Sequence, residues 1–201
     1  VSGKCSGFGT GANGPMDIKT STTLKNPMAS VTGNKGSKTL TLSNVSGSFI
    51  GGERVLIHQS QLNGSGVGSY EVGTIAGIGP NTLTLVDALK NTYVTKGSSH
   101  AQVIVIPQFT DVTVEAPATL TAPAWNGNTG GLLVFEASGT VTVKGTIAMS
   151  GRGFRGTSHA TACKYRCTNG IQGESEIGPG TPSPAANGSG AGGGTKGQDC
   201  G

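Results

Sequence analysis

Ten carboxylates are the first candidates for chemistry in this chain of 201 residues, because paired acids hold calcium or act as general acid and base. No Asp-Asp or Asp-x-Asp pair occurs, and the one close pair, Glu174-x-Glu176, lies in a glycine-rich stretch. The pattern therefore predicts no catalytic cluster, no metal site and no cofactor. The ten residues are Asp17, Glu53, Glu71, Asp87, Asp111, Glu115, Glu136, Glu174, Glu176 and Asp199.

The three histidines give no stronger signal. His58, His100 and His159 are separated by dozens of residues, and no nucleophile-elbow motif accompanies them. A Ser-His-Asp triad assembles from distant segments, so spacing alone does not decide the matter, but nothing in the chain supports one. We therefore predict that the protein is not an enzyme.

Four cysteines lie outside every strand-like run of the sequence. An even number of cysteines in loops is typical of two disulfides formed in an oxidising compartment, and three pairings are possible. Zinc is the rival interpretation, because Cys163-x3-Cys167 follows His159, but the ligand pairs of structural zinc sites are usually tighter. The cysteines are Cys5, Cys163, Cys167 and Cys200.

Other features agree with a secreted protein. Asn44, Asn63 and Asn187 each begin an Asn-x-Ser sequon for N-glycosylation, although such triplets arise often in a chain rich in serine and glycine. No run of 18 apolar residues occurs, so no membrane span is expected, and the first residues fit a chain whose signal peptide is already removed. The net charge of +4 is spread without a basic stripe, which argues against nucleic acid but allows weak attraction to acidic polysaccharide.

Aromatic residues make up only 4% of the chain, so each exposed ring is a candidate for stacking on a sugar. Trp125, the one tryptophan, lies between a strand end and a glycine-rich loop, where it either contacts a sugar or caps a core. The stretch GRGFRG places two arginines around Phe154, with a capping turn as the alternative. The possible glycan contacts are Trp125, Tyr70, Tyr93, Phe154, Arg152 and Arg155.

The elements that position these side chains are expected to be short strands, because 36 residues are glycine and Thr and Val alternate with polar residues. Residues 1–37 are polar with isolated apolar residues, so we expect an extended entry segment there. The phrase TLTL then occurs twice, each time ahead of an apolar strand, and residues 79–81 are typical of a turn. A small antiparallel sheet or barrel over residues 38–107 is predicted.

A repeat of 27–29 residues marks the next part of the chain. VIVI and VTV, at residues 103–106 and 112–114, recur 29 positions later as LLVF and VTV. TLTA at residues 119–122 recurs 27 positions later as TIAM. Three short strands per repeat fit one coil of a parallel β-solenoid, which we predict over residues 103–150, with chance hairpins as the alternative.

The repeat also predicts which way side chains point. In this register Val141, Val143 and Ile147 face inward, whereas Lys144 faces outward and lies opposite Glu115 as an exposed ion pair. After residue 150 the alternation fades and proline and glycine dominate. We expect residues 151–201 to be a glycine-rich tail pinned by disulfides.

Residues 106–156, IPQFTDVTVEAPATLTAPAWNGNTGGLLVFEASGTVTVKGTIAMSGRGFRG, resemble the opening coils of secreted proteins of the pectin-lyase-like right-handed β-helix superfamily. More narrowly, they resemble uncharacterised extracellular or cell-surface proteins in which a glycine-rich, cysteine-containing stretch follows. The resemblance covers roughly residues 38–160. It concerns architecture, since that superfamily includes lyases, hydrolases, phage tailspikes and adhesins.

The predicted fold class is all-β, with a small antiparallel β module, a short parallel β-solenoid and a glycine-rich tail. Uncovered strand edges and the lack of a catalytic cluster favour a secreted structural or adhesive protein that associates with itself into an extracellular filament or matrix. A carbohydrate-binding module is the first alternative, and a polysaccharide lyase or hydrolase is the second.

Overall fold

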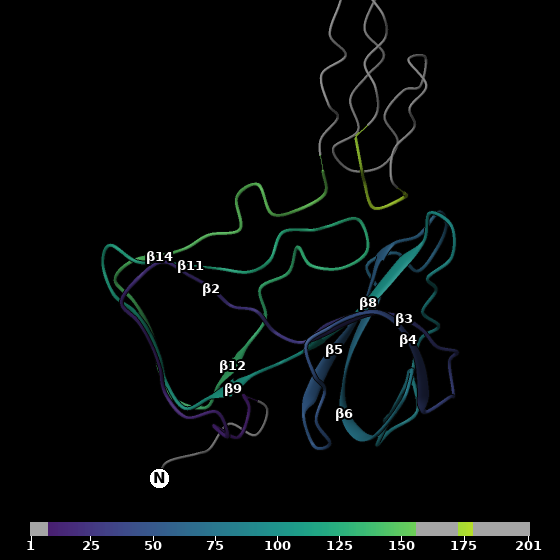
Figure 1. The fold of residues 1–201 in the computed structure, drawn as a ribbon, viewed down its shortest axis with the longest axis horizontal. Coiled ribbons are helices and arrows are strands. Elements are labelled where there is room, and N and C mark those ends of the chain that lie inside the picture. The colour runs from purple at the N-terminus through teal and green to yellow at the C-terminus, as the bar shows by residue number, and fades with distance from the viewer. Residues whose placement is uncertain (1–7, 156–172, 179–201) are drawn as a thin grey trace, which may run out of the picture.

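The computed structural model describes residues 8–155 and 173–178, and this part of the chain is all-β without a helix. A closed barrel and a group of short parallel sheets lie side by side (Figure 1). The four cysteines and Asn187 lie outside the described residues, so the disulfides and that sequon stay predictions.

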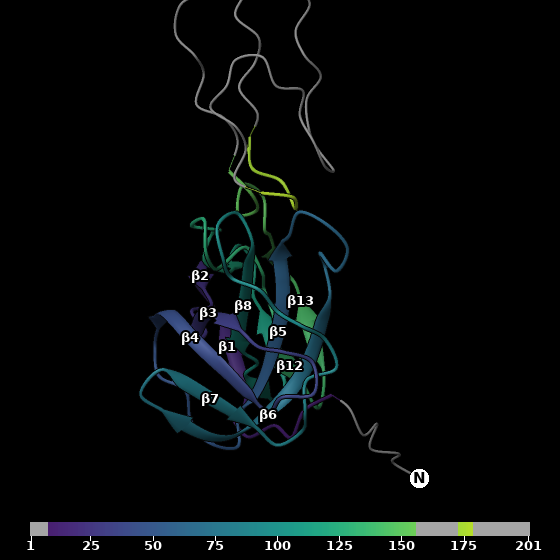
Figure 2. The same ribbon diagram turned by 90° about the vertical axis from the view of Figure 1, so that its right-hand side faces the viewer.

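Six antiparallel strands close the barrel in the order β3-β4-β7-β6-β5-β8, and Figure 2 looks onto it. The two TLTL phrases pair with each other, Leu40 opposite Leu83, and the predicted turn joins β6 to β7. The predicted antiparallel module is therefore confirmed. The strands are β3 Met28–Thr32, β4 Thr39–Ser46, β5 Arg54–Gln61, β6 Tyr70–Gly79, β7 Thr82–Leu85 and β8 His100–Val105.

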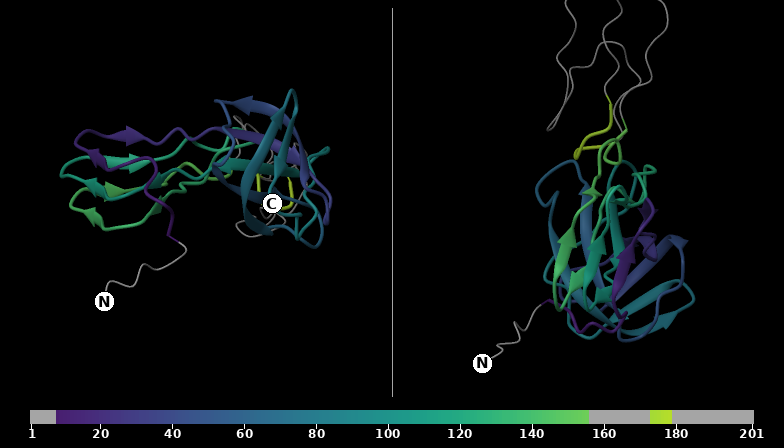
Figure 3. Two further views of the ribbon diagram at one scale, coloured as in Figure 1. Left: turned by 90° about the horizontal axis from the view of Figure 1, so that it is seen from below. Right: turned by 90° about the vertical axis from the view of Figure 1, so that its left-hand side faces the viewer.

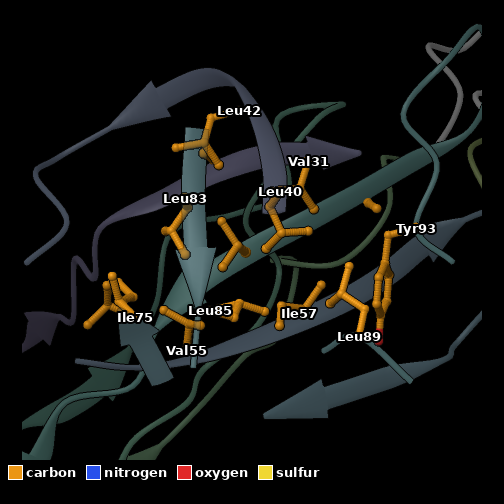
Figure 4. Packing of buried hydrophobic residues seen from close by; sticks show 14 residues of the cluster. Val31, Leu40, Leu42, Val55, Ile57, Ile75, Leu83, Leu85, Leu89 and Tyr93 are labelled. Atoms are coloured by element: carbon orange, nitrogen blue, oxygen red, sulfur yellow. The ribbon is translucent and has the colours of Figure 1, made fainter. Parts of the chain in front are cut away.

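The barrel core follows from the alternation of the strands, because successive side chains of a strand point to opposite faces. Leu40, Ile57 and Leu83 point inward from three different strands and are fully buried (Figure 4). Leu89 and Tyr93, from the loop between β7 and β8, join the same cluster. Aliphatic side chains thus fill the barrel interior.

The N-terminal segment is more structured than the sequence indicated. Within residues 1–37, β1 (Met16–Ile18) and β2 (Thr22–Thr23) join the parallel sheets, and β3 completes the barrel. The barrel therefore begins at Met28 rather than at residue 38. The strand partners of β1 and β2 lie near residues 112–121, so no local pattern signals them.

Three short parallel sheets stand beside the barrel, and successive passes of the chain that form their strands lie in layers, as Figure 3 shows from below. Val112 pairs with Val141 and Thr119 with Thr146, which are the predicted offsets of 29 and 27 residues. Two of the three predicted matches are therefore strand pairs. The sheets are β1-β10-β13, β2-β11-β14 and β9-β12, with β9 Gln108–Phe109, β10 Val112–Val114, β11 Thr119–Thr121, β12 Glu136–Ala137, β13 Val141–Val143 and β14 Thr146–Ile147.

The third predicted match, VIVI with LLVF, is not a strand pair. Both edges of β8 are already occupied by β3 and β5 in the barrel, so β8 has no edge left for residues 132–135. Those residues form no strand, and the pairing starts just after them, with Glu136 opposite Gln108. The predicted solenoid boundary at residue 103 is therefore wrong, because residues 103–105 belong to the barrel.

Candidate functional site

A cleft of about 310 Å³ lies where the end of β5 meets four loops. The loops come from residues 62–69, 122–135, 148–155 and 173–178, so segments far apart in the sequence converge on it. Much of its wall is apolar. The side chains that line it include His58, Ser60, Trp125, Leu132, Phe154 and Glu176.

Buried glutamines hold these loops against the barrel. Gln102 Nε2 donates to Ser60 Oγ at 2.8 Å and to the Gly130 carbonyl at 3.0 Å, and the Gly130 N–H donates to Gln102 Oε1 at 2.8 Å. Gln61 Nε2 donates to the carbonyls of Ser175 at 2.7 Å and Gly178 at 3.1 Å. Hydrogen bonds between buried groups are costly to break, so they fix the walls of the cleft.

Trp125 forms part of the wall and is only 4% exposed. Its ring makes edge-to-face contacts with Phe154 at 5.5 Å and His100 at 6.1 Å between ring centroids. Its backbone N–H donates to the Arg152 carbonyl, and Nε1 lies near the Glu174 carboxylate without a hydrogen bond of normal geometry. The indole therefore packs as a buried ring rather than as an open stacking platform.

The charges around the cleft follow from burial and one ion pair. Burial lowers the pKa of His58 and of His100, although Glu174 opposes the effect at His100, so both imidazoles are neutral at pH 7. Partial burial would raise the pKa of Glu174, but the hydrogen bonds and charge of Arg155 together lower it. Arg155 also closes the loop backbone, since its N–H donates to Glu174 Oε2 and its carbonyl accepts from the Glu174 N–H.

The six predicted glycan contacts do not form one surface. Phe154 lines the cleft and is 40% exposed, and Arg152 and Arg155 lie on the same loop. Tyr70 is 67% exposed on β6 but does not line the cleft. Tyr93 is fully buried in the barrel core, where burial raises the pKa of its hydroxyl, so it offers no face to a ligand.

The buried glutamines are the site residues that the sequence interpretation missed. In the phrase HQSQ, at residues 58–61, polar side chains continue an apolar strand, and three of the four are buried. A strand that ends in polar residues is typical of an exposed end, so the pattern pointed the wrong way. Only the loops that fold over β5 explain why Gln59, Ser60 and Gln61 are buried.

A second candidate surface is the last layer of the parallel sheets. The inward side chains of β10 and β11 are fully buried, but their partners in β13 and β14 are 39–47% exposed. In the parallel register, each of these β13 and β14 side chains points the same way as its buried partner. No described residue covers them, however. The pairs are Val112 with Val141, Val114 with Val143, and Leu120 with Ile147.

Several further residues and features that the sequence singled out lie outside the cleft. The ion pair of Lys144 with Glu115 is confirmed, at 3.1 Å and largely exposed. Asn44 and Asn63, the two described sequon residues, are exposed. Within residues 8–155 and 173–178, no three His, Cys, Asp or Glu side chains converge as metal ligands, and no helix has the length and apolar character to cross a membrane.

No protein-family model matches this chain, and no curated protein matches it at a significant level. Among solved structures, it is similar to the Gp54 tailspike of Acinetobacter baumannii bacteriophage AP22, in complex with A. baumannii capsular saccharide. The identity is 12% and the TM-score 0.34, over 67% of this chain and 27% of the tailspike chain. A likeness at this level assigns neither a family nor a function, so membership of the β-helix superfamily stays a prediction.

Proposed function

We propose that this is a secreted structural or adhesive protein. We propose that the successive layers of its parallel strands are the coils of a short β-solenoid. We further propose that it associates with a second copy through the end layer, defined as Val141, Val143 and Ile147. The observation that supports this is the contrast between these half-exposed side chains and their fully buried partners one layer below.

The physical reason is that the end layer carries both apolar side chains and an open strand edge. Fully burying an aliphatic side chain stabilises by about 1.5–3 kcal/mol, so each half-exposed member leaves about 1 kcal/mol unused. Among the strands that the structure describes, β13 and β14 are at the edges of their sheets, and an edge strand presents unpaired N–H and C=O groups to another chain. A covering layer satisfies both at once.

The two ends of the stack differ, and this difference sets the geometry of association. Ile18, in the first layer, is 2% exposed and Met16 is half-buried, so the described residues of that end expose less apolar surface than the end layer does. Contact between two such end layers is isologous and has a twofold axis, which gives a dimer rather than a chain of subunits. A filament or matrix then needs a second contact elsewhere on the surface.

The free energy gained by burying the end-layer side chains predicts weak association. Three side chains at about 1 kcal/mol each on either copy give about 6 kcal/mol, which is close to the cost of immobilising two proteins. Backbone pairing between the edges must supply the remainder. We therefore expect a dimer that forms at micromolar to millimolar concentration and dissociates on dilution.

Sedimentation velocity of the full chain over a range of concentrations tests the proposal. Val143→Glu should abolish the concentration-dependent dimer, because it places a charge in the contact. Val86→Glu is the matched control, since Val86 is also 47% exposed but lies after β7 on the barrel. A monomer at every concentration, or equal loss with both variants, contradicts association through the end layer.

A further inference from the structure

We propose that Asn63 is a site of spontaneous deamidation, in which its side chain closes on the backbone nitrogen of Gly64 to form a succinimide. Both residues lie in the loop of residues 62–69 that joins β5 to β6, and two members of this loop, Val67 and Gly68, line the cleft. Neither reacting residue belongs to the end layer, so the inference does not depend on the proposed association. It rests on the residue pair, the open space around it and the contrast with two similar pairs.

The chemistry needs an asparagine that is followed by a small residue. The backbone nitrogen of the second residue attacks Cγ of the asparagine, so that an N–Cγ bond forms and the Cγ–Nδ2 bond breaks. Nδ2 leaves as ammonia and carries away the proton of the attacking nitrogen. Water then opens the ring at either carbonyl, which leaves aspartate or isoaspartate. A glycine in the second position helps, because it has no Cβ to obstruct the attack and adopts backbone angles that other residues avoid.

The pair of Asn63 and Gly64 meets these conditions. Asn63 is exposed, and no described residue forms a hydrogen bond with its side chain or with the Gly64 N–H. A Cβ built on Gly64 has open space around it. The loop is bonded near its ends, by the N–H groups of Leu62 at 2.8 Å and of Gly68 at 2.9 Å. Ring closure at Asn63 therefore breaks no hydrogen bond within the described structure.

The pair of Asn13 and Gly14 has the same two residue types but is held in place. Asn13 Oδ1 accepts from the Gln108 N–H at 2.7 Å, and the Asn13 N–H donates to the Gln108 carbonyl at 2.8 Å. The Gly14 N–H, which belongs to the attacking nitrogen, donates to the Gly11 carbonyl at 2.9 Å. Both reacting groups must give up a hydrogen bond before the ring can close.

The pair of Asn126 and Gly127 is held in a different way. Asn126 Oδ1 accepts from the N–H groups of Asn128 at 2.9 Å and Thr129 at 3.0 Å, which makes this side chain part of the turn. A Cβ on Gly127 would meet the Arg155 guanidinium at 2.6 Å, so this glycine is packed against a neighbour whereas Gly64 is open. The side chain must leave the turn before its Cγ can be attacked.

This contrast gives a prediction of relative rates. The loss of one hydrogen bond slows ring closure severalfold, so the loss of two slows it about tenfold or more. Asn63 should therefore deamidate about tenfold or more faster than Asn13 and Asn126 in the folded protein. In the unfolded protein these bonds are broken, and the three rates should lie within about threefold of one another. Asn169 and Asn187 also precede glycine but lie outside the described residues.

The product changes the loop beside the cleft. Deamidation replaces a neutral amide with a carboxylate, which lowers the net charge of +4 by one unit. Isoaspartate also adds one carbon atom to the backbone of the loop, next to the hydrogen bond of the Leu62 N–H. Because Nδ2 is also the acceptor nitrogen of the Asn63 sequon, a glycan there would protect the residue, and the two modifications exclude each other.

The experiment follows the full chain, secreted into the bacterial periplasm so that it carries no N-glycan and its cysteines can oxidise. The folded protein is incubated for several weeks at mildly alkaline pH in water labelled with heavy oxygen, and a second sample is incubated in guanidinium chloride. Peptide mapping by mass spectrometry gives the rate at each asparagine, because the label marks conversion during the incubation. Electron-transfer fragmentation distinguishes isoaspartate from aspartate.

Two variants and a control identify the ring closure. Gly64→Val should slow the conversion of Asn63 about tenfold or more, because a β-branched side chain obstructs the attack. Asn63→Gln keeps the amide but lengthens the side chain, and it should remove the acidic species that arises from this position. Ser65→Ala is the matched control, since it removes the sequon, leaves the pair intact and should deamidate as fast as the parent.

Two results overturn the proposal. The first is that Asn63 stays unchanged in the folded protein while it converts in guanidinium chloride, because the fold then protects it. The second is that Asn13 or Asn126 converts as fast as Asn63 in the folded protein, since their hydrogen bonds then do not control the rate. Faster conversion at Asn63 than at the other two, at equal rates in the parent and in Ser65→Ala, supports it.

Discussion

Gln102 provides the sharpest test of how the loops are attached to the barrel. It is 1% exposed on β8, and its amide makes three hydrogen bonds, two of them with Gly130. Gln102→Met keeps the length of the side chain but removes the amide. The variant therefore isolates the hydrogen bonds from the effect of a cavity.

The expected magnitude follows from the groups left behind. The N–H and C=O of Gly130 both lose their partner in a buried position, while Ser60 Oγ keeps its contact with His58. Each unsatisfied buried group costs about 1–3 kcal/mol, so the loss is about 2–6 kcal/mol. That is a large fraction of the 5–15 kcal/mol typical of a folded domain.

Two measurements distinguish a loss of stability of the whole domain from local detachment of the loop. Urea unfolding followed by circular dichroism gives the change in the free energy of unfolding, and the emission of Trp125 reports on the loop that carries Gly130. If the loop detaches by itself, the emission shifts to longer wavelength before the barrel unfolds. Thr84→Val, at an exposed position of β7, is the control and should be neutral.

The reasoning fails under one clear result. If Gln102→Met lies within about 0.5 kcal/mol of the parent, the ordinary range for surface changes, and the emission of Trp125 is unchanged, then the glutamine does not hold the loop.

Two further predictions concern the parallel layers and the buried histidines. Gly145→Ala should destabilise by about 1–3 kcal/mol in thermal unfolding, because a Cβ there meets the Ala118 carbonyl oxygen at 2.2 Å, whereas Gly51→Ala, with open space around it, should have little effect. A neutral Gly145→Ala would show that the layers can separate without cost. Because burial lowers the pKa of His58 and His100 below 6.5, the unfolded chain binds more protons in acid, so stability should be full above pH 6.5 and fall as the pH drops below it. Urea midpoints between pH 7.5 and 5 measure this slope, and the double variant with glutamine at both positions should flatten it; an equally steep slope in that variant would assign the effect to other groups.

Much of the architecture could be predicted because it depends on local alternation. A strand shows its buried face through every second residue, so the TLTL phrases and the apolar strands that follow them identify the barrel. The offsets of 29 and 27 residues likewise became strand pairs, since stacked layers place equivalent residues beside one another. The exposed pair of Lys144 and Glu115 follows from the same register.

The short strands of the N-terminal segment could not be predicted in this way. β1 and β2 contain three and two residues, too few for a period to show, and they exist because distant partners bond to them. The LLVF segment shows the opposite error, since here the sequence predicts a strand that does not form. Its expected partner, β8, already pairs with β3 and β5 and has no free edge. Strand propensity indicates that a segment fits a sheet, but an available edge decides whether it joins one.

The sequence by itself determined that the protein is all-β, that an antiparallel module precedes a repeat, and which residues share a register. Only the tertiary structure decided that Trp125 and Tyr93 are buried, that Phe154 remains half-exposed, and that buried glutamines fix the loops around a cleft. It also decided that Val143 is 47% exposed although its strand partner Val114 is fully buried. The physical reason is that alternation sets the direction of a side chain, whereas its burial depends on which distant segment covers it.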